Sequence, residues 1–234
     1  MEARVKENQE RECIARKRLP ASDKRFKLYT TDIKNEIPEI PDNSVDLIVT
    51  DPPYKSRFID CYDWLGNFAS RVLKHGGCLL VLCGQHHLYE EMSRLNKYLK
   101  YYWMLSYTMT GSKSGIGKQR DVFIHWKPVL WYVKGVYTRG YVSDLCSPES
   151  GNIGKSLHIW QQSEMGIRSI MQKFVNVGDV ICDPFCGSST TGVIALEMEC
   201  NQYIGIDKEQ TCIDISRSRL IDRIKELSKK DKIA

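Results

Sequence analysis

The chain has 234 residues and a mass of 27.0 kDa, enough for one ordinary α/β domain or at most two small ones. Hydrophobic residues make up 42% and charged residues 27%, so the chain can bury a core, and this composition excludes a disordered protein. No apolar run approaches the roughly 18 residues of a membrane span, and residues 1–25 lack the apolar stretch of a signal peptide. We therefore expect neither a membrane segment nor secretion.

The nine cysteines are scattered along the chain and include no Cys-x-x-Cys pair. Disulfide frameworks and structural zinc sites both need cysteines in characteristic spacings. This pattern instead indicates reduced thiols, several of them in the core. We expect a cytoplasmic protein without a bound metal.

The net charge of +5 is unevenly distributed. Residues 1–27 and 217–234 each carry a net charge of +4, whereas residues 28–216 carry −3. Within that middle part, residues 92–140 hold nine basic residues against the single Asp121, a local net charge of +8. Such a local surplus, more than the bulk charge, indicates contact with a nucleic acid.

Apolar runs and apolar residues at helical spacing alternate along most of the chain. Residues 1–25 form a charged arm or helix, residues 111–117 a flexible loop and residues 143–156 a mobile connection. The expected strands are 26–30, 45–50, 78–83, 101–109, 122–133 (bending at Pro128), 180–182 and 203–206. The expected helices are 62–74, 88–99, 163–175, 190–199 and a charged amphipathic helix at the end of the chain.

This alternation of strands and helices favours a largely parallel, doubly wound α/β sheet. The strand runs are continuously apolar, as expected for strands covered on both faces. In such sheets ligands bind beyond the carboxyl ends of the strands.

The first unusual strand end is residues 183–192, Asp-Pro-Phe-Cys-Gly-Ser-Ser-Thr-Thr-Gly. A strand followed by a turn of small residues and a helix places backbone N–H groups close to a ligand. Asp207, at the end of the next strand and 20 residues after Gly187, can hydrogen-bond two ribose hydroxyls. A plain tight turn before a capped helix is the alternative. A phosphate-binding loop is excluded because no Lys follows the glycine turn.

The second is Asp51-Pro52-Pro53-Tyr54. Two prolines lock the backbone and remove two donors, which leaves carbonyl oxygens available. Asp51 and the Pro52 carbonyl can then accept the two hydrogens of an amino group while Tyr54 stacks on a planar ring. A proline turn without function is the alternative.

Together, the two motifs resemble those of the DNA amino-methyltransferases that use S-adenosylmethionine. The order, with Asp-Pro-Pro-Tyr first and Asp-Pro-Phe-x-Gly-Ser-x-Thr-Thr last, is similar to that of the circularly permuted β group. Residues 28–46, 126–135 and 158–163 also resemble segments of this group, and the similarity covers about 26–220. It implies a Rossmann-like, mostly parallel sheet of the class I methyltransferase type. The implied domains are an arm (1–25), a catalytic domain (26–220) with a short target-recognition insertion around 107–156, and a basic tail (221–234).

The resemblance implies methyl transfer to the exocyclic N6 of an adenine that is flipped out of double-stranded DNA. Asp51, Pro52, Pro53 and Tyr54 are the implied catalytic residues, and Asp rather than Ser at the first position favours adenine. No covalent enzyme intermediate is needed, so none of the cysteines has to act as a nucleophile. The alternatives are an N4-cytosine or RNA amino-methyltransferase and a catalytically weak DNA-binding homologue.

The implied cofactor is S-adenosylmethionine. Its methionine end would be held by the loop residues Asp183, Phe185, Gly187, Ser188 and Thr190. Asp207 is the implied ribose acid, Asp32 the candidate for the adenine end, and Gln162 and Ser163 further pocket residues. The family usually has a second glycine where Ser189 stands, so we expect its Cβ to crowd the cofactor.

Lys113, Lys118 and Arg120 belong to no core element and are the candidates for phosphate contacts. The aromatic residues between the basic ones from 92 to 140 are either core residues or stacking groups for DNA. The expected partner is double-stranded DNA, with a homodimer left open. The recognition segments, 107–121 and 136–156, are short, so we expect a brief target site or help from a partner. The resemblance implies a bacterial or phage-encoded enzyme, either of a restriction-modification pair or an orphan.

Overall fold

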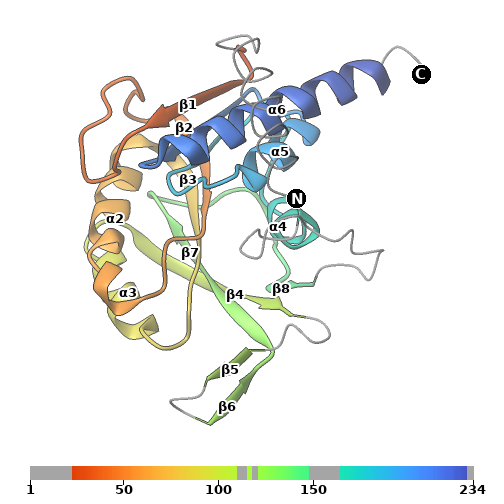
Figure 1. Ribbon diagram of the computed structural model, residues 1–234. Helices are drawn as coiled ribbons and strands as arrows, with labels where there is room; N and C mark the ends of the chain where they lie inside the picture. Colours follow the sequence, from red (N-terminus) through yellow and green to blue (C-terminus); the bar gives the residue numbers. More distant parts are fainter. Residues whose placement is uncertain (1–22, 110–114, 118–120, 148–163, 231–234) are drawn as a thin grey trace, which may run out of the picture.

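An eight-stranded sheet forms the centre of the computed structural model, which describes residues 23–109, 115–117, 121–147 and 164–230 (Figure 1). Its strands in spatial order are β1 (Phe26–Thr30), β10 (Gln202–Asp207), β9 (Val180–Asp183), β2 (Val45–Thr50), β3 (Leu73–Leu82), β7 (Trp126–Val133), β4 (Lys100–Thr108) and β8 (Leu145–Cys146). A separate hairpin consists of β5 (Gly115–Gly117) and β6 (Val122–Ile124). The helices are η1 (Ser56–Phe58), α2 (Cys61–Val72), α3 (Leu88–Leu95), α4 (Glu164–Met171), α5 (Thr190–Glu197) and α6 (Gln210–Lys230).

The five strands from β1 to β3 in spatial order are mutually parallel. β7 is antiparallel to both of its neighbours, β3 and β4. Although β9 and β10 come last in the chain, they lie between β1 and β2, which come first. Leu47 of β2 therefore pairs with Ile181 of β9, and the carboxyl ends of these two strands lie side by side.

Helices lie on both faces of the sheet (Figure 1), and a hydrophobic layer is buried on each face. Side chains alternate between the faces of a strand, so Leu47 and Val49 of β2 pack in the layer with α4, α5 and α6. Ile48, between them, packs in the other layer, with α2 and α3. Both faces are buried, which explains the unbroken apolar runs and confirms the expected doubly wound α/β fold.

Several element boundaries differ from the expectation. The strand expected over 122–133 is interrupted at His125, not bent at Pro128, because Pro128 remains in β7 opposite Ser106 and its carbonyl accepts the Cys83 N–H at 3.0 Å. The loop expected over 111–117 contains β5, which pairs with β6. β3 begins at Leu73, before the glycine pair that was expected to precede it.

At the C-terminal end, α6 continues through the domain boundary expected at residue 220. Ile221 and Ile224 are buried in the layer of α4 and α5, so this part of the helix belongs to the core rather than to a tail. The expected N-terminal arm lies almost wholly outside the described residues. No helix in the described part of the chain is both long and apolar enough to cross a membrane.

Candidate active site at the carboxyl ends of β2, β9 and β10

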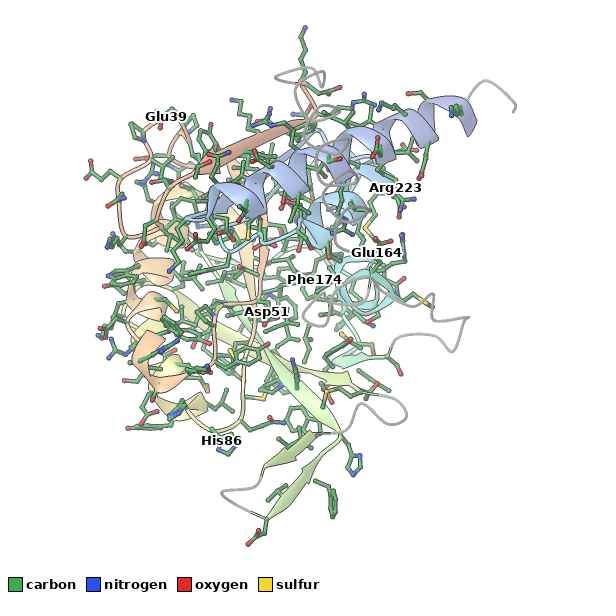
Figure 2. All side chains as sticks on the ribbon, in the orientation of Figure 1. Glu39, Asp51, His86, Glu164, Phe174 and Arg223 are labelled. Atoms are coloured by element: carbon green, nitrogen blue, oxygen red, sulfur yellow. The ribbon has the colours of Figure 1, made fainter. Side chains whose placement is uncertain are left out.

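Asp51-Pro52-Pro53-Tyr54 follows β2 directly, at the carboxyl edge of the sheet. Pro52 is buried, whereas Pro53 is exposed. The Tyr54 hydroxyl donates a hydrogen bond to the Asp51 carboxylate. Figure 2 shows Asp51 near the middle of the molecule. The prolines thus hold one carboxylate and one aromatic ring next to each other at the end of a buried strand.

The ring of Tyr54 has two neighbours that sequence reasoning missed. The ammonium of Lys127, on β7, lies 4.9 Å from the ring centroid, and its Nζ is 3.4 Å from the Tyr54 hydroxyl. The second neighbour is Gly84. A Cβ at this position would lie 3.6 Å from the Tyr54 side chain, so the backbone of Gly84 passes close to Tyr54. Burial and the Asp51 charge raise the pKa of Tyr54, which keeps its hydroxyl protonated and able to donate.

A buried hydrogen bond joins the two sequence motifs. Thr50, the last residue of β2, donates its hydroxyl to Asp183 Oδ1 at 2.8 Å. The Phe185 N–H donates to the same oxygen at 3.1 Å. Asp183 ends β9, so this contact spans the two adjacent strand ends and holds the tetrapeptide beside the loop that follows β9.

Asp183 is almost completely buried, and its pKa is raised to about 6. Desolvation is the largest cause, and the charge of Asp51 acts in the same direction. Hydrogen bonds from Thr50, Thr191 and the Phe185 amide oppose the shift. Thr50, which hydrogen-bonds Asp183, directly precedes Asp51, so the two acids lie at adjacent strand ends.

Asp183→Asn tests this elevated pKa. The folded protein binds the Asp183 proton more tightly than the unfolded chain, so stability from this group is present below about pH 4 and is lost as the pH rises through about 6. We expect the free energy of unfolding of the wild type, relative to the variant, to fall by about 2 kcal/mol between pH 4 and pH 7. Urea unfolding at pH 4, 5, 6 and 7 measures it. Parallel pH profiles for the two proteins would show that Asp183 titrates normally.

The loop after β9 is held against Asp207, at the end of β10. Asp207 Oδ2 accepts the Gly187 N–H at 3.0 Å, and its Oδ1 accepts the Glu209 N–H at 2.9 Å. Each carboxylate oxygen has a second lone pair that can accept another hydrogen bond. Gly187 has φ of +50°, a conformation that glycine adopts without steric cost.

Ser189, whose Cβ we expected to crowd the cofactor, points into the core. Its side chain is fully buried, and its Oγ accepts a hydrogen bond from the Tyr203 hydroxyl at 3.1 Å. A ligand at the surface of the loop cannot touch a fully buried side chain. The cost of a serine here is its backbone conformation, with φ of +56° and ψ of +45°, which favours glycine.

The remaining candidates differ in where they lie. Asp32 follows β1 at the same edge of the sheet, where the Thr31 N–H donates to the Asp207 carbonyl at 3.0 Å. The carboxylate of Asp32 accepts the Lys34 N–H at 3.0 Å. Ser188 and Thr190 both contact Arg219 of α6. Five predicted residues lie outside the described part of the chain: Lys113, Lys118, Arg120, Gln162 and Ser163.

The described cysteines are free thiols, and all but Cys212 are buried. Burial raises the pKa of Cys182 and Cys186, the two nearest to the loop after β9. A thiol that stays protonated is a poor nucleophile. These observations support chemistry without a cysteine nucleophile.

Several described basic residues of 92–140 are paired with acids. Lys97, just after α3, binds Asp63 at 2.8 Å, and Arg94 of α3 also pairs with Asp63. Arg139 pairs with Asp179 at 2.6 Å, at the amino end of β9 and so at the end of the strand opposite the site. Paired charges attract phosphates less, so the local net charge of +8 overstates the positive potential in this region.

The β5–β6 hairpin extends from the start of β7, near the tetrapeptide, and projects away from the sheet (Figure 1). Gln85 Nε2, in the loop after β3, donates to the Trp126 carbonyl at 2.5 Å at the base of this hairpin. Val122 and Phe123 are exposed on it, by 53% and 69%. Of the aromatic residues in the basic region, Tyr107 is buried, whereas Trp103 and Trp126 are exposed.

Comparison with known proteins agrees with this geometry. The family model described as DNA methylase, N6_N4_Mtase, matches residues 136–218. M.HinfI, a type II methyltransferase of Haemophilus influenzae, is 25% identical over 246 residues, covering 81% of this chain and 66% of that protein. M.HpaI of Haemophilus parainfluenzae, also a type II methyltransferase, is 24% identical, covering 77% of this chain and 69% of that protein. The chain thus spans about two thirds of the length of these relatives.

Solved structures share the fold. The complex of M1.HpyAVI with S-adenosylmethionine superposes with a TM-score of 0.68 at 22% identity, over 83% of this chain and 98% of that one. The cytosine-N4-specific PvuII DNA methyltransferase superposes with a TM-score of 0.69 at 15% identity, over 88% and 93%. The chain therefore has the Rossmann-like α/β fold of the class I methyltransferases, as expected from its sequence.

Proposed function

We propose that this protein is a DNA amino-methyltransferase that uses S-adenosylmethionine. The hydrogen bond from Thr50 to Asp183 carries the proposal, because it places an acceptor for an amino group beside a loop suited to a nucleoside cofactor. The match of residues 136–218 to the DNA methylase family and the similarity to two type II methyltransferases support it.

The residues after β9 and β10 fit this cofactor. Asp207 keeps acceptor capacity for ribose hydroxyls while two backbone amides fix its orientation. The loop 183–190 precedes α5, whose N-terminal end favours the carboxylate of the methionine part. Bound there, the cofactor supplies an activated methyl group. Asp32, Gln162 and Ser163 remain proposed contacts of the cofactor.

On the side of the target base, an exocyclic nitrogen is a weak nucleophile because its lone pair is delocalised into the ring. Asp51 and the Pro52 carbonyl, by accepting its two hydrogens, favour a pyramidal nitrogen whose lone pair points outward. Tyr54 supplies a stacking face, worth roughly 1–3 kcal/mol per base, which offsets part of the cost of flipping the base out. The rate then comes from alignment and electrostatics.

The finer proposal is that the target is N6 of adenine, because Asp51 stands at the head of the tetrapeptide. N4-cytosine is the second candidate, since the PvuII enzyme, which is cytosine-N4-specific, has the same fold. The proposed target is double-stranded DNA.

Methylation of plasmid DNA by the purified protein tests both levels of the proposal. Nucleoside mass spectrometry after incubation with S-adenosylmethionine should show N6-methyladenine, and sequencing of modified bases gives the recognition site. N4-methylcytosine would overturn the finer assignment alone. Binding of S-adenosylmethionine and DNA without any methylated nucleoside would favour the catalytically weak homologue.

The double variant Lys113→Ala with Lys118→Ala tests the proposed phosphate contacts. Each lost phosphate contact should reduce the slope of log K against log salt by about 1, so the double variant should bind DNA more weakly and with a flatter salt dependence. Fluorescence anisotropy over a salt series measures it. Lys97→Ala is the control, because Lys97 pairs with Asp63. An unchanged slope in the double variant would remove both lysines from the DNA interface.

A further inference from the structure

The C-terminal helix α6 holds the loop after β9 from behind. Ser216 donates its hydroxyl to the Gly187 carbonyl at 2.7 Å and is completely buried. One turn further along, the Arg219 guanidinium donates to the Ser188 carbonyl at 2.5 Å and to the Ser188 hydroxyl at 3.0 Å. The same nitrogen, Nη1, lies 3.3 Å from Thr190 Oγ1. Two successive carbonyls of the loop are therefore occupied by donors from one helix.

These contacts determine which way the loop amides point. A trans peptide is planar, so its N–H points opposite to its carbonyl. With the Gly187 carbonyl turned toward Ser216, the N–H of Ser188 must point away from α6. The neighbouring Gly187 N–H donates to Asp207 at 3.0 Å, the acid at which we place the ribose of the cofactor. The Ser188 N–H thus stays free of α6, and the Gly187 N–H is fixed at the proposed cofactor acid.

Arg219 is itself held in place. Its other terminal nitrogen, Nη2, binds Glu164 Oε1 at 2.8 Å, at the start of α4. Its side chain is only 22% exposed. A guanidinium can serve several acceptors at once in a fixed plane, which a lysine ammonium on a flexible stem does less well. The arginine therefore connects α4, α6 and the loop.

We propose that Arg219 is a positioning residue that sets the affinity for S-adenosylmethionine by fixing the peptide group between Ser188 and Ser189 and the side chains of Ser188 and Thr190. It acts through the loop and needs no contact with the cofactor. The inference rests on the proposed function, since it concerns the same cofactor site.

The chain offers a matched control one helical turn away. Arg223 also binds Glu164, at 3.5 Å, and it binds Glu197 of α5 at 2.8 Å. Its side chain is 25% exposed, much like that of Arg219, but none of these partners lies in the loop. Figure 2 shows Glu164 and Arg223 close together beside α4 and α6. Arg223→Met thus removes a similar helix-to-helix ion pair and leaves the loop contacts intact.

The experiment compares Arg219→Met, Arg219→Lys and Arg223→Met with the wild type by calorimetric titration with S-adenosylmethionine and by steady-state kinetics. Losing hydrogen bonds to a charged group should raise the dissociation constant of Arg219→Met about tenfold or more. We expect Arg219→Lys to lie between that variant and the wild type, and Arg223→Met to stay within about twofold of the wild type. The KM for the cofactor should follow these values, while kcat at saturating cofactor and the KM for DNA stay near those of the wild type.

Thermal unfolding without ligand checks that the variants are folded. If Arg219→Met does not fold, Arg219→Lys still tests the proposal. Equal cofactor affinity in the wild type and both Arg219 variants would overturn the inference. An equal loss in Arg219→Met and Arg223→Met would overturn it too, because the effect would then come from helix docking. If the wild type bound no S-adenosylmethionine at all, the proposed function itself would fail.

Discussion

Replacing Asp51 with alanine should abolish methyl transfer and leave cofactor binding nearly unchanged. In the proposed mechanism Asp51 accepts an amino hydrogen, and an interaction that strengthens as charge develops acts on kcat rather than on ground-state binding. Removing one such group typically costs about 10²–10³ in kcat, and the loss should be at least this large because no other acid stands in the tetrapeptide. The proposed cofactor contacts follow β9 and β10 rather than β2, so calorimetry should give a dissociation constant within about twofold of the wild type.

Two further variants sharpen this result. Asp51→Asn keeps one acceptor oxygen and loses the charge, so it should retain more activity than Asp51→Ala. Asp60→Ala, at an exposed acid that pairs with Arg94, should behave like the wild type. Methylation by Asp51→Ala at the wild-type rate would show that this carboxylate is not the acceptor.

Asp207→Ala should weaken S-adenosylmethionine binding by about 10²-fold. The substitution removes the proposed ribose acceptor and also leaves the Gly187 and Glu209 amides without their present partner. Hydrogen bonds to a charged group contribute roughly 1.5–3 kcal/mol each, so losing more than one explains a change of this size. The KM for the cofactor should rise strongly. The tetrapeptide with Asp51 and Tyr54 is unaltered in this variant.

Glu209→Ala is the control for this prediction, because Glu209 is exposed and contributes its backbone N–H rather than its side chain. It should bind the cofactor like the wild type. Asp207→Asn should be intermediate, since an amide keeps one oxygen acceptor and replaces the other with a donor. Unaltered cofactor affinity in Asp207→Ala would place the ribose elsewhere.

The parallel half of the sheet could be predicted well because its strands carry continuous apolar runs that end at motifs. β2, β9 and β10 lie within one or two residues of their expected positions. The antiparallel half was harder. β6 and β7 are separated only by His125, and β5 contains two glycines that indicate a loop when read locally. Pairing with another strand decides such cases, and a local pattern does not contain the partner.

The residues of the candidate site also divide into those that local sequence patterns reveal and those that only the fold brings together. The tetrapeptide and the loop after β9 are contiguous motifs, so they could be found from residue order. Lys127 could not, since it stands in an apolar strand far from Tyr54 along the chain. Arg219 looks like any charge on an amphipathic helix until α6 is placed against the loop.

The alternation of strands and helices and the two motifs could be recognised in the sequence, because each depends on neighbours within a few residues. The use of charges and side chains became visible only when the chain was folded. The fold pairs Arg94, Lys97 and Arg139 with acids, so the net charge of +8 in residues 92–140 overstates the positive charge that is available to bind DNA. The fold also turns Ser189 into the core, toward Tyr203. Electrostatics and packing depend on distance in space, and chain order does not specify that distance.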